Sequence, residues 1–271
     1  MKTSEITSPA NPRVKGWASL ARKKGRDTYG QFLVEGPHLV TEALCSGAKV
    51  HCVVYDRDRG LPAEVKQAAE GRTDLEWVAV TPEIVAKCCD TVQPQGVFAV
   101  VGVEDADAGR LIGKPDALVI AADGVQDPGN LGTIIRSADA AGADGVVIGR
   151  GSADVYNPKT VRSTMGSLFH LPIAAEADLP AVLRKAREHG AQVVAASVDA
   201  EDNLYDLDCR RPTWFVVGSE AHGLSAEVLA SVNRFVKIPM RGAAESLNVA
   251  MAATLLLYEA LRQREFASKQ D

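Results

Sequence analysis

The stretch 123–149, DGVQDPGNLGTIIRSADAAGADGVVIG, constrains the fold of this chain more than any other. The short apolar run Leu118–Ala122 before it is typical of a strand buried on both faces of a sheet. Glycine and proline then interrupt regular structure up to Asn130, and from Leu131 apolar residues recur at helical spacing. Val146–Ile148 is typical of a second buried strand. This pattern predicts a β-loop-α-β unit whose loop lies where open α/β sheets bind ligands.

Two polar residues of this unit are candidates for chemistry. Asn130 stands at the expected N-cap of the helix, and capping alone would explain it. Arg136 lies inside the helix and, at about 3.6 residues per turn, well away from the face of Asn130. The two can converge on one ligand only if Asn130 lies outside the helix, and a solvated Arg136 is the simpler alternative.

A second loop of the same type follows the apolar strand expected at Trp214–Val217. Two glycines in Gly218–Ser225 permit close backbone approach to a ligand. Glu220 has small neighbours, so its carboxylate could point into a pocket, although an exposed acid near a helix start is the simpler alternative.

The third loop, 239–248, leads into a long helix expected at Leu247–Gln263. That helix is apolar nearly all round, which predicts that it is buried or lies at an interface. Ser246 is well placed to cap it. Asn248 opens the helix, and a buried amide there needs hydrogen-bonding partners.

The chain is expected to divide into a basic amino-terminal arm, a small α/β domain, a polar linker and a second α/β domain, at residues 1–30, 31–103, 104–115 and 116–271. Strands and helices should alternate in the small domain, at Phe32–Glu35, Pro37–Ser46, Val50–Tyr55, Pro62–Ala69, Leu75–Val80, Pro82–Cys88 and Gln95–Val103. Further elements of the second domain are expected at Asn157–Ser167, Leu179–His189, Gln192–Ser197 and Phe235–Ile238.

Charge is unevenly distributed along the chain. The formal net charge of −5 gives no global sign of nucleic-acid binding. The first thirty residues are nevertheless basic, with seven lysines and arginines against Glu5 and Asp27. This predicts local phosphate binding, and a solvated amphipathic helix is the equal alternative.

Several classes of protein are disfavoured by the sequence. The five cysteines form no CxxC pair and the five histidines show no metal-ligand spacing, which argues against a disulfide scaffold or a metal site and for a reducing cytoplasm. The amino terminus has no apolar core of a signal peptide, and the most apolar run is shorter than the roughly 20 residues of a membrane span. The motifs GxGxxG, GxxxxGK[ST] and GxSxG are absent from the sequence, which weakens the case for an NAD enzyme, an NTPase or a hydrolase.

Three segments together resemble the successive motifs of the SpoU (TrmH-like) family of RNA ribose 2′-O-methyltransferases in the SPOUT superfamily. They are DGVQDPGNLGTIIRSADAAGADGVV, VVGSEAHGLS and IPMRGAAESLNVAMAATLLLYEALR, in the family's order and spacing over essentially the whole second domain. The first domain resembles the family's ribosomal-protein-like α/β substrate-binding domain.

The resemblance implies a fold and a cofactor. A carboxyl-terminal parallel sheet with a deep trefoil knot would follow the small α/β domain, an exception to the rule that chains do not thread their own loops. S-adenosyl-L-methionine (AdoMet) would sit in the knot, held largely by backbone groups. The implied contacts, with Gly218, Ile238 and Leu247 foremost, are Ser197, Val217, Gly218, Glu220, Gly223, Leu224, Ile238, Met240, Leu247 and Asn248.

The resemblance also implies catalytic roles for Arg136, Asn130, Glu220, Ser246 and Asn248. Family proposals make Arg136 the base for the ribose hydroxyl, but an arginine stays charged throughout the usable pH range. Arg136 could instead clamp the phosphate beside the target, or its pKa could be strongly depressed in the complex. We favour the clamp, because methyl transfer depends chiefly on in-line placement. Asn130 would position Arg136 and the ribose, Glu220 would order its loop, Ser246 would support the RNA, and Asn248 would tie the loops together.

The implied partners are RNA and a second copy of the chain, with no metal and no membrane. Ribosomal RNA is the favoured substrate. A transfer-RNA methyltransferase, a non-catalytic RNA-binding relative and a nucleotide-dependent metabolic enzyme remain alternatives. The expected location is the cytoplasm. Candidate RNA contacts are Arg13, Lys15, Arg22, Lys23, Lys24, Arg26, Lys159 and Arg162.

Overall fold

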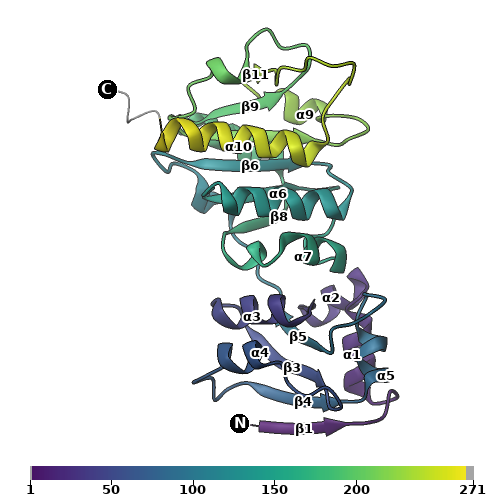
Figure 1. Ribbon diagram of the computed structural model, residues 1–271. Coiled ribbons are helices and arrows are strands. Elements are labelled where there is room, and N and C mark those ends of the chain that lie inside the picture. The colour runs from purple at the N-terminus through teal and green to yellow at the C-terminus, as the bar shows by residue number, and fades with distance from the viewer. Residues whose placement is uncertain (1, 267–271) are drawn as a thin grey trace. The chain divides into compact units, whose positions relative to one another are not determined.

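The structure is a computed structural model that describes residues 2–266 (Figure 1). By its contacts, the chain forms two compact units. Unit 1 comprises the residues up to Glu104 together with Tyr156–His170, and unit 2 comprises Asp105–Val155 and the residues from Leu171 onward. Within residues 2–266, no helix is long and apolar enough to cross a bilayer.

Unit 1 is built on a five-stranded sheet with strand order β1-β4-β3-β5-β2. The β5 strand runs antiparallel to its neighbours β2 and β3, and the other pairs are parallel. The strands are β1 (Lys2–Ile6), β2 (Gln31–Glu35), β3 (Val50–Asp56), β4 (Glu76–Val80) and β5 (Val97–Gly102). The helices are α1 (Pro12–Ser19), α2 (Lys23–Tyr29), α3 (Pro37–Cys45), α4 (Ala63–Ala68) and α5 (Pro82–Cys88).

The first thirty residues do not form a separate arm. β1 pairs in parallel with β4 at the edge of the sheet. Val14, Trp17 and Leu20 are buried in the same apolar cluster as β3 and β5 residues, and Trp17 packs edge-on against Phe98 at 5.9 Å between ring centroids. The basic residues predicted there are therefore carried on structured helices.

The segment Tyr156–His170, which we call the inserted segment, belongs to unit 1 although its flanks belong to unit 2. It contains α7 (Pro158–Thr164) and the short helix η2 (Ser167–Phe169). The ring centroids of Tyr156 and Phe169 lie 4.6 and 6.4 Å from that of Phe32 on β2, so the segment completes the core of unit 1.

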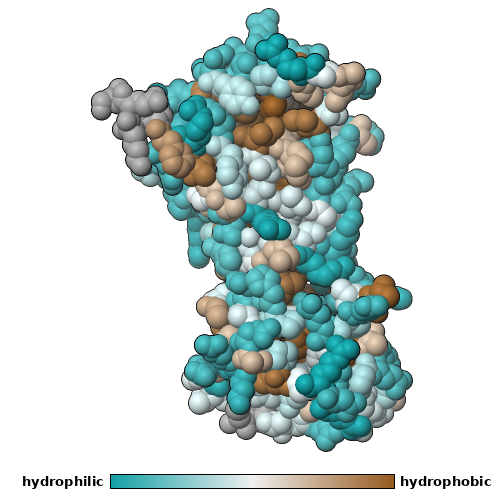
Figure 2. All heavy atoms as spheres, viewed as in Figure 1, coloured by the Kyte–Doolittle hydropathy of each residue, from teal (hydrophilic) through white to brown (hydrophobic). Residues whose placement is uncertain are grey.

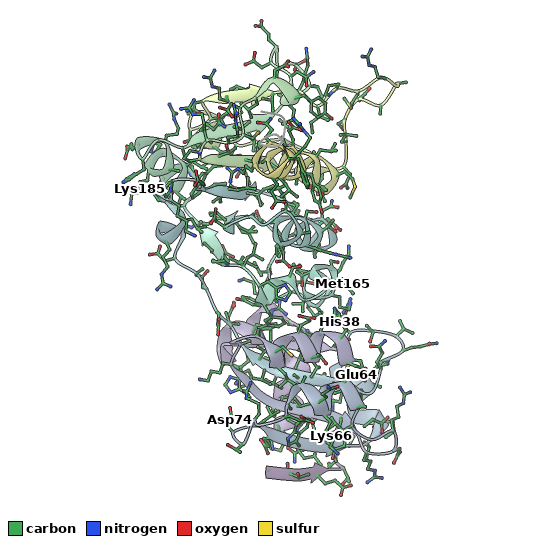
Figure 3. All side chains as sticks on the ribbon, turned by 60° about the vertical axis from the view of Figure 1, so that its left-hand side comes forward. His38, Glu64, Lys66, Asp74, Met165 and Lys185 are labelled. Carbon is green, nitrogen blue, oxygen red and sulfur yellow. The ribbon has the colours of Figure 1, made fainter. Side chains whose placement is uncertain are left out.

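Polar contacts also hold the inserted segment to α3. His170 Nε2 lies 3.0 Å from Glu42 Oε2, and His38 Nε2 lies 3.1 Å from the carbonyl oxygen of Met165. Figure 3 shows His38 and Met165 next to each other. Gly166 has φ +99°, and a Cβ there would lie 2.6 Å from Glu42 Cγ, so only glycine allows this close approach.

Unit 2 is built on a six-stranded, wholly parallel sheet with strand order β11-β9-β10-β6-β7-β8. Its strands are β6 (Leu118–Asp123), β7 (Gly145–Gly149), β8 (Ile173–Ala177), β9 (Gln192–Ala196), β10 (Thr213–Gly218) and β11 (Arg234–Val236). Its helices are α6 (Pro128–Ala140), α8 (Leu179–Glu188), α9 (Ala226–Leu229) and α10 (Val249–Glu265), with short turns η1 (Ala108–Leu111) and η3 (Leu204–Asp206).

The strand order of unit 2 determines where a ligand can bind. From β6 the chain builds outward through β7 to β8, and then returns to the other side of β6 with β9 and β10. The sequential order therefore reverses between β6 and β10. In open parallel sheets, ligands bind at the carboxyl ends of the strands that flank such a reversal. The α/β class and parallel sheet expected from the sequence are thus confirmed.

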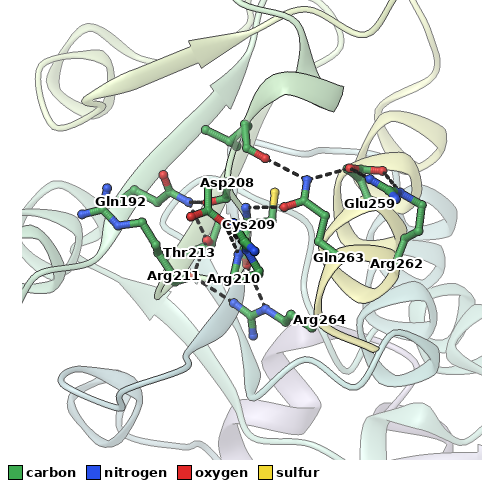
Figure 4. A network of polar contacts seen from close by, with 11 residues as sticks. Gln192, Asp208, Cys209, Arg210, Arg211, Thr213, Glu259, Arg262, Gln263 and Arg264 are labelled. Atoms are coloured by element: carbon green, nitrogen blue, oxygen red, sulfur yellow. Dashed lines mark hydrogen bonds and ion pairs between the residues drawn. The ribbon is translucent and has the colours of Figure 1, made fainter. Parts of the chain in front are cut away.

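The carboxyl end of α10 is anchored by a polar network (Figure 4). Gln263 is 9% exposed; its oxygen accepts from the Cys209 N–H at 2.8 Å and its amide donates to the Leu207 carbonyl at 2.8 Å. Arg264 donates to four backbone carbonyls, those of Cys209, Asp116, Ala117 and Arg211, at 2.7–3.2 Å. The network satisfies carbonyls next to the starts of β6 and β10, which fixes α10 against the centre of the sheet.

Candidate functional site

The first strand-end loop differs in one respect from the sequence-based expectation. Asp127, not Asn130, is the N-cap of α6, because its carboxylate accepts the Asn130 N–H at 2.9 Å and Pro128 occupies the first helical position. Asn130 lies in the first helical turn, so its own side chain is not used for capping and can reach across to other loops.

Three polar side chains from the three loops meet at this end of the sheet. The amide of Asn130 donates to Glu220 Oε1 at 2.6 Å, and the amide of Asn248 donates to Asn130 Oδ1 at 3.1 Å. We call Asn130, Glu220 and Asn248 the polar trio. It joins residues that are 90 and 118 positions apart in the chain, at the point where the strand order reverses.

Asn248 has a second role, at the amino terminus of α10. Its Oδ1 accepts the N–H groups of Ala250 and Met251 at 3.0 and 3.3 Å, so Asn248 caps the helix. The expectation that Ser246 provides this cap is wrong, because the helix begins at Val249. Capping uses the oxygen of the Asn248 side chain, and its amide nitrogen is left to donate to Asn130.

The second loop is a tight turn. Ser219 and Gly223 exchange two backbone hydrogen bonds at 2.9 and 2.8 Å, and Gly223 has φ +67°. A Cβ on Gly218 would lie 2.4 Å from the carbonyl carbon of Gly223, so this position requires glycine. Asp123, at the end of β6, accepts the Ser225 N–H at 2.7 Å and ties the second loop to the first. Asp123 is not among the residues predicted from the sequence, although a carboxylate at a strand end is a recognisable signal.

A hollow opens beside the third loop. Its lining includes five residues of interest, the predicted cofactor contacts Ser197, Ile238, Met240 and Leu247 and the predicted catalytic residue Ser246. Its walls are largely aliphatic and two hydroxyl groups provide polar contacts, which fits an aromatic ring with polar edges such as adenine. The other predicted cofactor contacts are not among the residues that line the hollow: Val217, Gly218, Glu220, Gly223, Leu224 and Asn248. Of these, Val217 is buried in β10 and Leu224 packs against the core.

Arg136 stands apart from the polar trio. It is exposed on α6, six residues after Asn130, which places it about 9 Å further along the axis and about 120° around it. Because Asn130 lies inside the helix, the two side chains leave α6 in different directions. Ser246 is also exposed, in the loop before α10.

The predicted RNA-binding residues of unit 1 fall into two groups. Lys15, Arg22 and Lys24 are exposed, as are Lys23, which lies 3.6 Å from Asp27, and Lys159. In the second group, Arg13, Arg26 and Arg162 donate short hydrogen bonds to protein groups. Arg26 is 4% exposed and donates to the Leu20 carbonyl at 2.7 Å, so the prediction that it contacts RNA phosphate is wrong.

Arg13 and Arg162 are paired with carboxylates. Arg13 makes a bidentate contact with Glu76 at 2.7 and 2.9 Å and lies over the Trp17 ring; the hydrogen bond to Glu76 raises the pKa of Arg13 above its usual value. Arg162 donates to Asp90 at 2.8 Å. Both guanidinium groups therefore already have protein partners.

Comparisons with known proteins agree with this geometry. The SpoU rRNA Methylase family model matches residues 117–258, and the MRM3-like substrate binding domain model matches residues 11–99. The chain belongs to the SpoU rRNA methylase family.

This chain matches known relatives over nearly its full length. It is 35% identical to the 23S rRNA (guanosine(2553)-2′-O)-methyltransferase RlmP of Bacillus subtilis, over 94% of this chain and 98% of the relative. The SpoU methyltransferase AviRb of Streptomyces viridochromogenes in complex with AdoMet superposes with a TM-score of 0.86 at 35% identity, covering 94% and 98% of the two chains. An AdoMet-bound rRNA methyltransferase of Sinorhizobium meliloti gives 0.85 at 34% identity, covering 97% and 99%.

These matches confirm what the sequence predicted about the class of protein. The chain is an AdoMet-dependent RNA ribose 2′-O-methyltransferase. The catalytic and binding assignments are predictions based on the geometry described above.

Proposed function

We propose that the three strand-end loops of unit 2 form a single active site that methylates a ribose of large-subunit ribosomal RNA. The single observation that carries this proposal is the polar trio, which joins the three motif loops where the strand order reverses. The relatives whose names specify 23S rRNA support the choice of RNA.

The residues beside the third loop fit AdoMet. Its adenine would lie in the hollow between Ile238, Met240 and Leu247, with Ser197 and Ser246 near the polar edges. The second loop, in which Gly218 closely approaches Gly223, would hold the rest of the cofactor through its backbone groups. When bound, AdoMet supplies an electrophilic methyl group on a positively charged sulfur.

The chain's own residues would place the ribose hydroxyl in line with that methyl group. Asn130 is oriented by its bonds to Glu220 and Asn248, so its amide is held in one position before RNA binds. Glu220 would order the second loop, and Asn248 would join the first and third loops. Arg136 leaves α6 about 120° around from Asn130, so the two side chains would not meet on one group. Arg136 would bind a separate group of the same RNA, the phosphate next to the target, to which its exposed guanidinium can donate two parallel hydrogen bonds.

We also propose that the protein is a homodimer that uses α10. On the face shown in Figure 2, apolar side chains gather over this helix. Leu247 is 38% exposed, and Met251, Leu255 and Tyr258 are 49%, 39% and 46% exposed at helical spacing along one side of α10. An apolar stripe of this kind marks an interaction surface, and a second copy would bury it.

Two further expectations belong to this proposal. The family resemblance implies a deep trefoil knot in the carboxyl-terminal part of unit 2. A cytoplasmic location is supported by the five cysteines, all of which are free thiols.

Methyl transfer from tritiated AdoMet to 23S rRNA, followed by mapping of the modified ribose, tests the proposed function. We expect one 2′-O-methylated nucleotide with the wild-type chain. Arg136→Ala should lower kcat about 10²-fold or more, because in-line placement is lost. AdoMet affinity measured by calorimetry should not change. Near-normal turnover of this variant would contradict the role of Arg136, and absence of ribose methylation by the wild type would contradict the function.

A further inference from the structure

The inserted segment is connected to the first loop of the active site at its start. Ala153 donates its backbone N–H to the Val125 carbonyl at 2.8 Å, and Ser152 Oγ lies 3.3 Å from the Ala122 carbonyl. Val155, the last residue before the inserted segment, is 2% exposed. The chain therefore leaves unit 2 from a point fixed to the loop that follows β6.

Further along, Arg162 joins the inserted segment to a second loop of unit 1. Its Nη2 donates to Asp90 Oδ2 at 2.8 Å, and its Nη1 lies 4.0 Å from Glu35 Oε1. The Glu35 side chain is only 8% exposed, and the Asp90 side chain is 48% exposed. One guanidinium thus bridges a buried and an exposed carboxylate.

Glu35 in turn holds the backbone of the same loop, residues 89–96. Its Oε1 accepts the Asp90 N–H at 2.6 Å, and its Oε2 accepts the Thr91 N–H at 3.3 Å and the Thr91 hydroxyl at 3.1 Å. The tip of the loop is Val92, which is 98% exposed. This loop lies within residues 11–99, which match the MRM3-like substrate binding domain model, and a loop held at its base by Glu35 can contact a partner without first being ordered.

We propose that Arg162 is a positioning residue for the RNA substrate, which holds loop 89–96 of the substrate-binding domain in the conformation that contacts RNA. The inference rests on the proposed function. Arg162, which holds this loop through Asp90, lies nine residues after Ala153 in the chain, and Ala153 is hydrogen-bonded to Val125 in the first active-site loop. Arg162 would therefore act through Asp90 and Glu35 and not by touching RNA.

A direct phosphate contact by Arg162, as the sequence predicts, has a different signature. If Arg162 bound phosphate, removal of the nearby negative charge in Asp90→Asn would leave RNA binding unchanged or strengthen it. If Arg162 acts through Asp90, the same substitution breaks the pair and produces the defect of Arg162→Met. The sign of the Asp90→Asn effect therefore separates the two.

The experiment compares Arg162→Met, Asp90→Asn and the double variant in the rRNA methylation assay. The matched control is Arg72→Met, which breaks the Arg72–Asp74 pair elsewhere in unit 1, with 3.0 Å between Nε and Oδ1. We expect each test variant to raise KM for rRNA about tenfold and the double variant to be no worse than either single one, because both remove one interaction. AdoMet affinity and kcat at saturating RNA should stay close to their wild-type values in each test variant. Arg72→Met should have a KM for rRNA close to that of the wild type. Arg162→Lys should reverse part of the rise in KM seen with Arg162→Met.

Two results would overturn the inference while the proposed function stands. One is a wild-type or lower KM for Asp90→Asn, combined with a flatter salt dependence for Arg162→Met, which indicates direct phosphate contact. The other is a wild-type KM for both variants. Because Asp90 is half exposed, Asp90→Asn should fold even if Arg162→Met does not. A wild-type enzyme that methylates no ribose in rRNA would instead overturn the proposed function.

Discussion

The two ends of α10 are held by different kinds of contact. At its amino terminus, Asn248 reaches the rest of the site through side-chain amides and a carboxylate, and both Asn248 and Glu220 are exposed. At its carboxyl terminus, Gln263 and Arg264 bond chiefly to backbone groups, and Gln263 is buried.

This difference between the two ends of α10 indicates that one end binds ligands and the other holds the helix in the fold. Exposed side-chain contacts gain little net stability, because water competes for the same groups, and they can be exchanged for contacts with a ligand. Buried contacts to backbone carbonyls cannot be exchanged without leaving unpaired polar groups. The amino-terminal end of α10 is thus suited to catalysis, and the carboxyl-terminal end keeps the helix in place.

The sharpest test of this comparison is Asn130→Ala. It should lower methyl transfer roughly 10²–10³-fold through lost orientation of the ribose. The melting temperature should change little, because the trio is largely exposed. The matched control is Asp127→Ala, which removes the cap of the same helix and should cost about 1 kcal/mol of stability with a much smaller loss of activity. A comparable loss of activity in both variants would contradict the distinction.

Gln263→Leu tests the supporting end. It leaves the buried Cys209 N–H and Leu207 carbonyl without their partner, which should cost about 2–4 kcal/mol and lower the melting temperature by roughly 5–15 °C. Turnover at 20 °C should stay near wild type. Gln67→Leu, on the exposed face of α4, is the control and should leave the melting temperature nearly unchanged. A shift as small as that of the control would show that the network contributes little.

The pH dependence of the same network gives a smaller effect. A hydrogen bond from Arg262 to Glu259 holds the pKa of Glu259 below its usual value, with a further bond from Gln263. A lowered folded-state pKa contributes stability that is present above the unfolded pKa and lost as pH falls through the folded one. At pH 7 the free energy of unfolding of the wild type should exceed that of Glu259→Gln by about 1 kcal/mol. The difference is this small because Arg262 is exposed and solvent screens the pair.

That difference should shrink below about pH 4.5 and vanish in stronger acid. Thermal melts of both proteins between pH 3 and 8 measure it. A difference that stays constant with pH would show that the Glu259 carboxylate is not the source of the stability.

The smallest effect concerns the reactivity of one thiol. Burial raises the pKa of Cys209 to about 12, so it should resist Ellman's reagent at pH 8, whereas the exposed Cys45 should react first. Gln263→Leu should speed labelling of Cys209 severalfold, because the loop that carries it loses an anchor. Cys52 and Cys88, buried in unit 1, are internal controls whose rates should not change, and peptide mass spectrometry resolves all four.

Much of the fold could be predicted from local sequence because the central strands are continuous apolar runs. Leu118–Ala122 and Trp214–Val217 were recognisable for this reason, and they are buried central strands in the structure. The apolar spacing predicts that helix α6 starts at Leu131, three residues after Pro128, where it begins in the structure. Asp127 followed by Pro128 is the stronger start signal, and it competes with Asn130 for the cap position.

What the sequence could not show depends on contacts between residues far apart in the chain. The polar trio was expected only as a convergence of strand-end loops, and the bonds that pair Asn130 with Glu220 and Asn248 appear only in three dimensions. The same holds for Arg162, whose partner Asp90 lies 72 residues away. A charged residue on a helix has the same appearance in sequence whether it faces RNA, water or a carboxylate.

The inserted segment has a consequence for how such proteins can be recombined. A gene fusion that joined a foreign substrate-binding module at residue 104 would leave Tyr156 and Phe169 without the aromatic ring of Phe32 against which they pack. Two separated pieces of coding sequence would have to be exchanged together to keep that core intact. We therefore expect the two halves of the enzyme to be inherited as one piece, and swapped modules to need a matching stretch of 156–170.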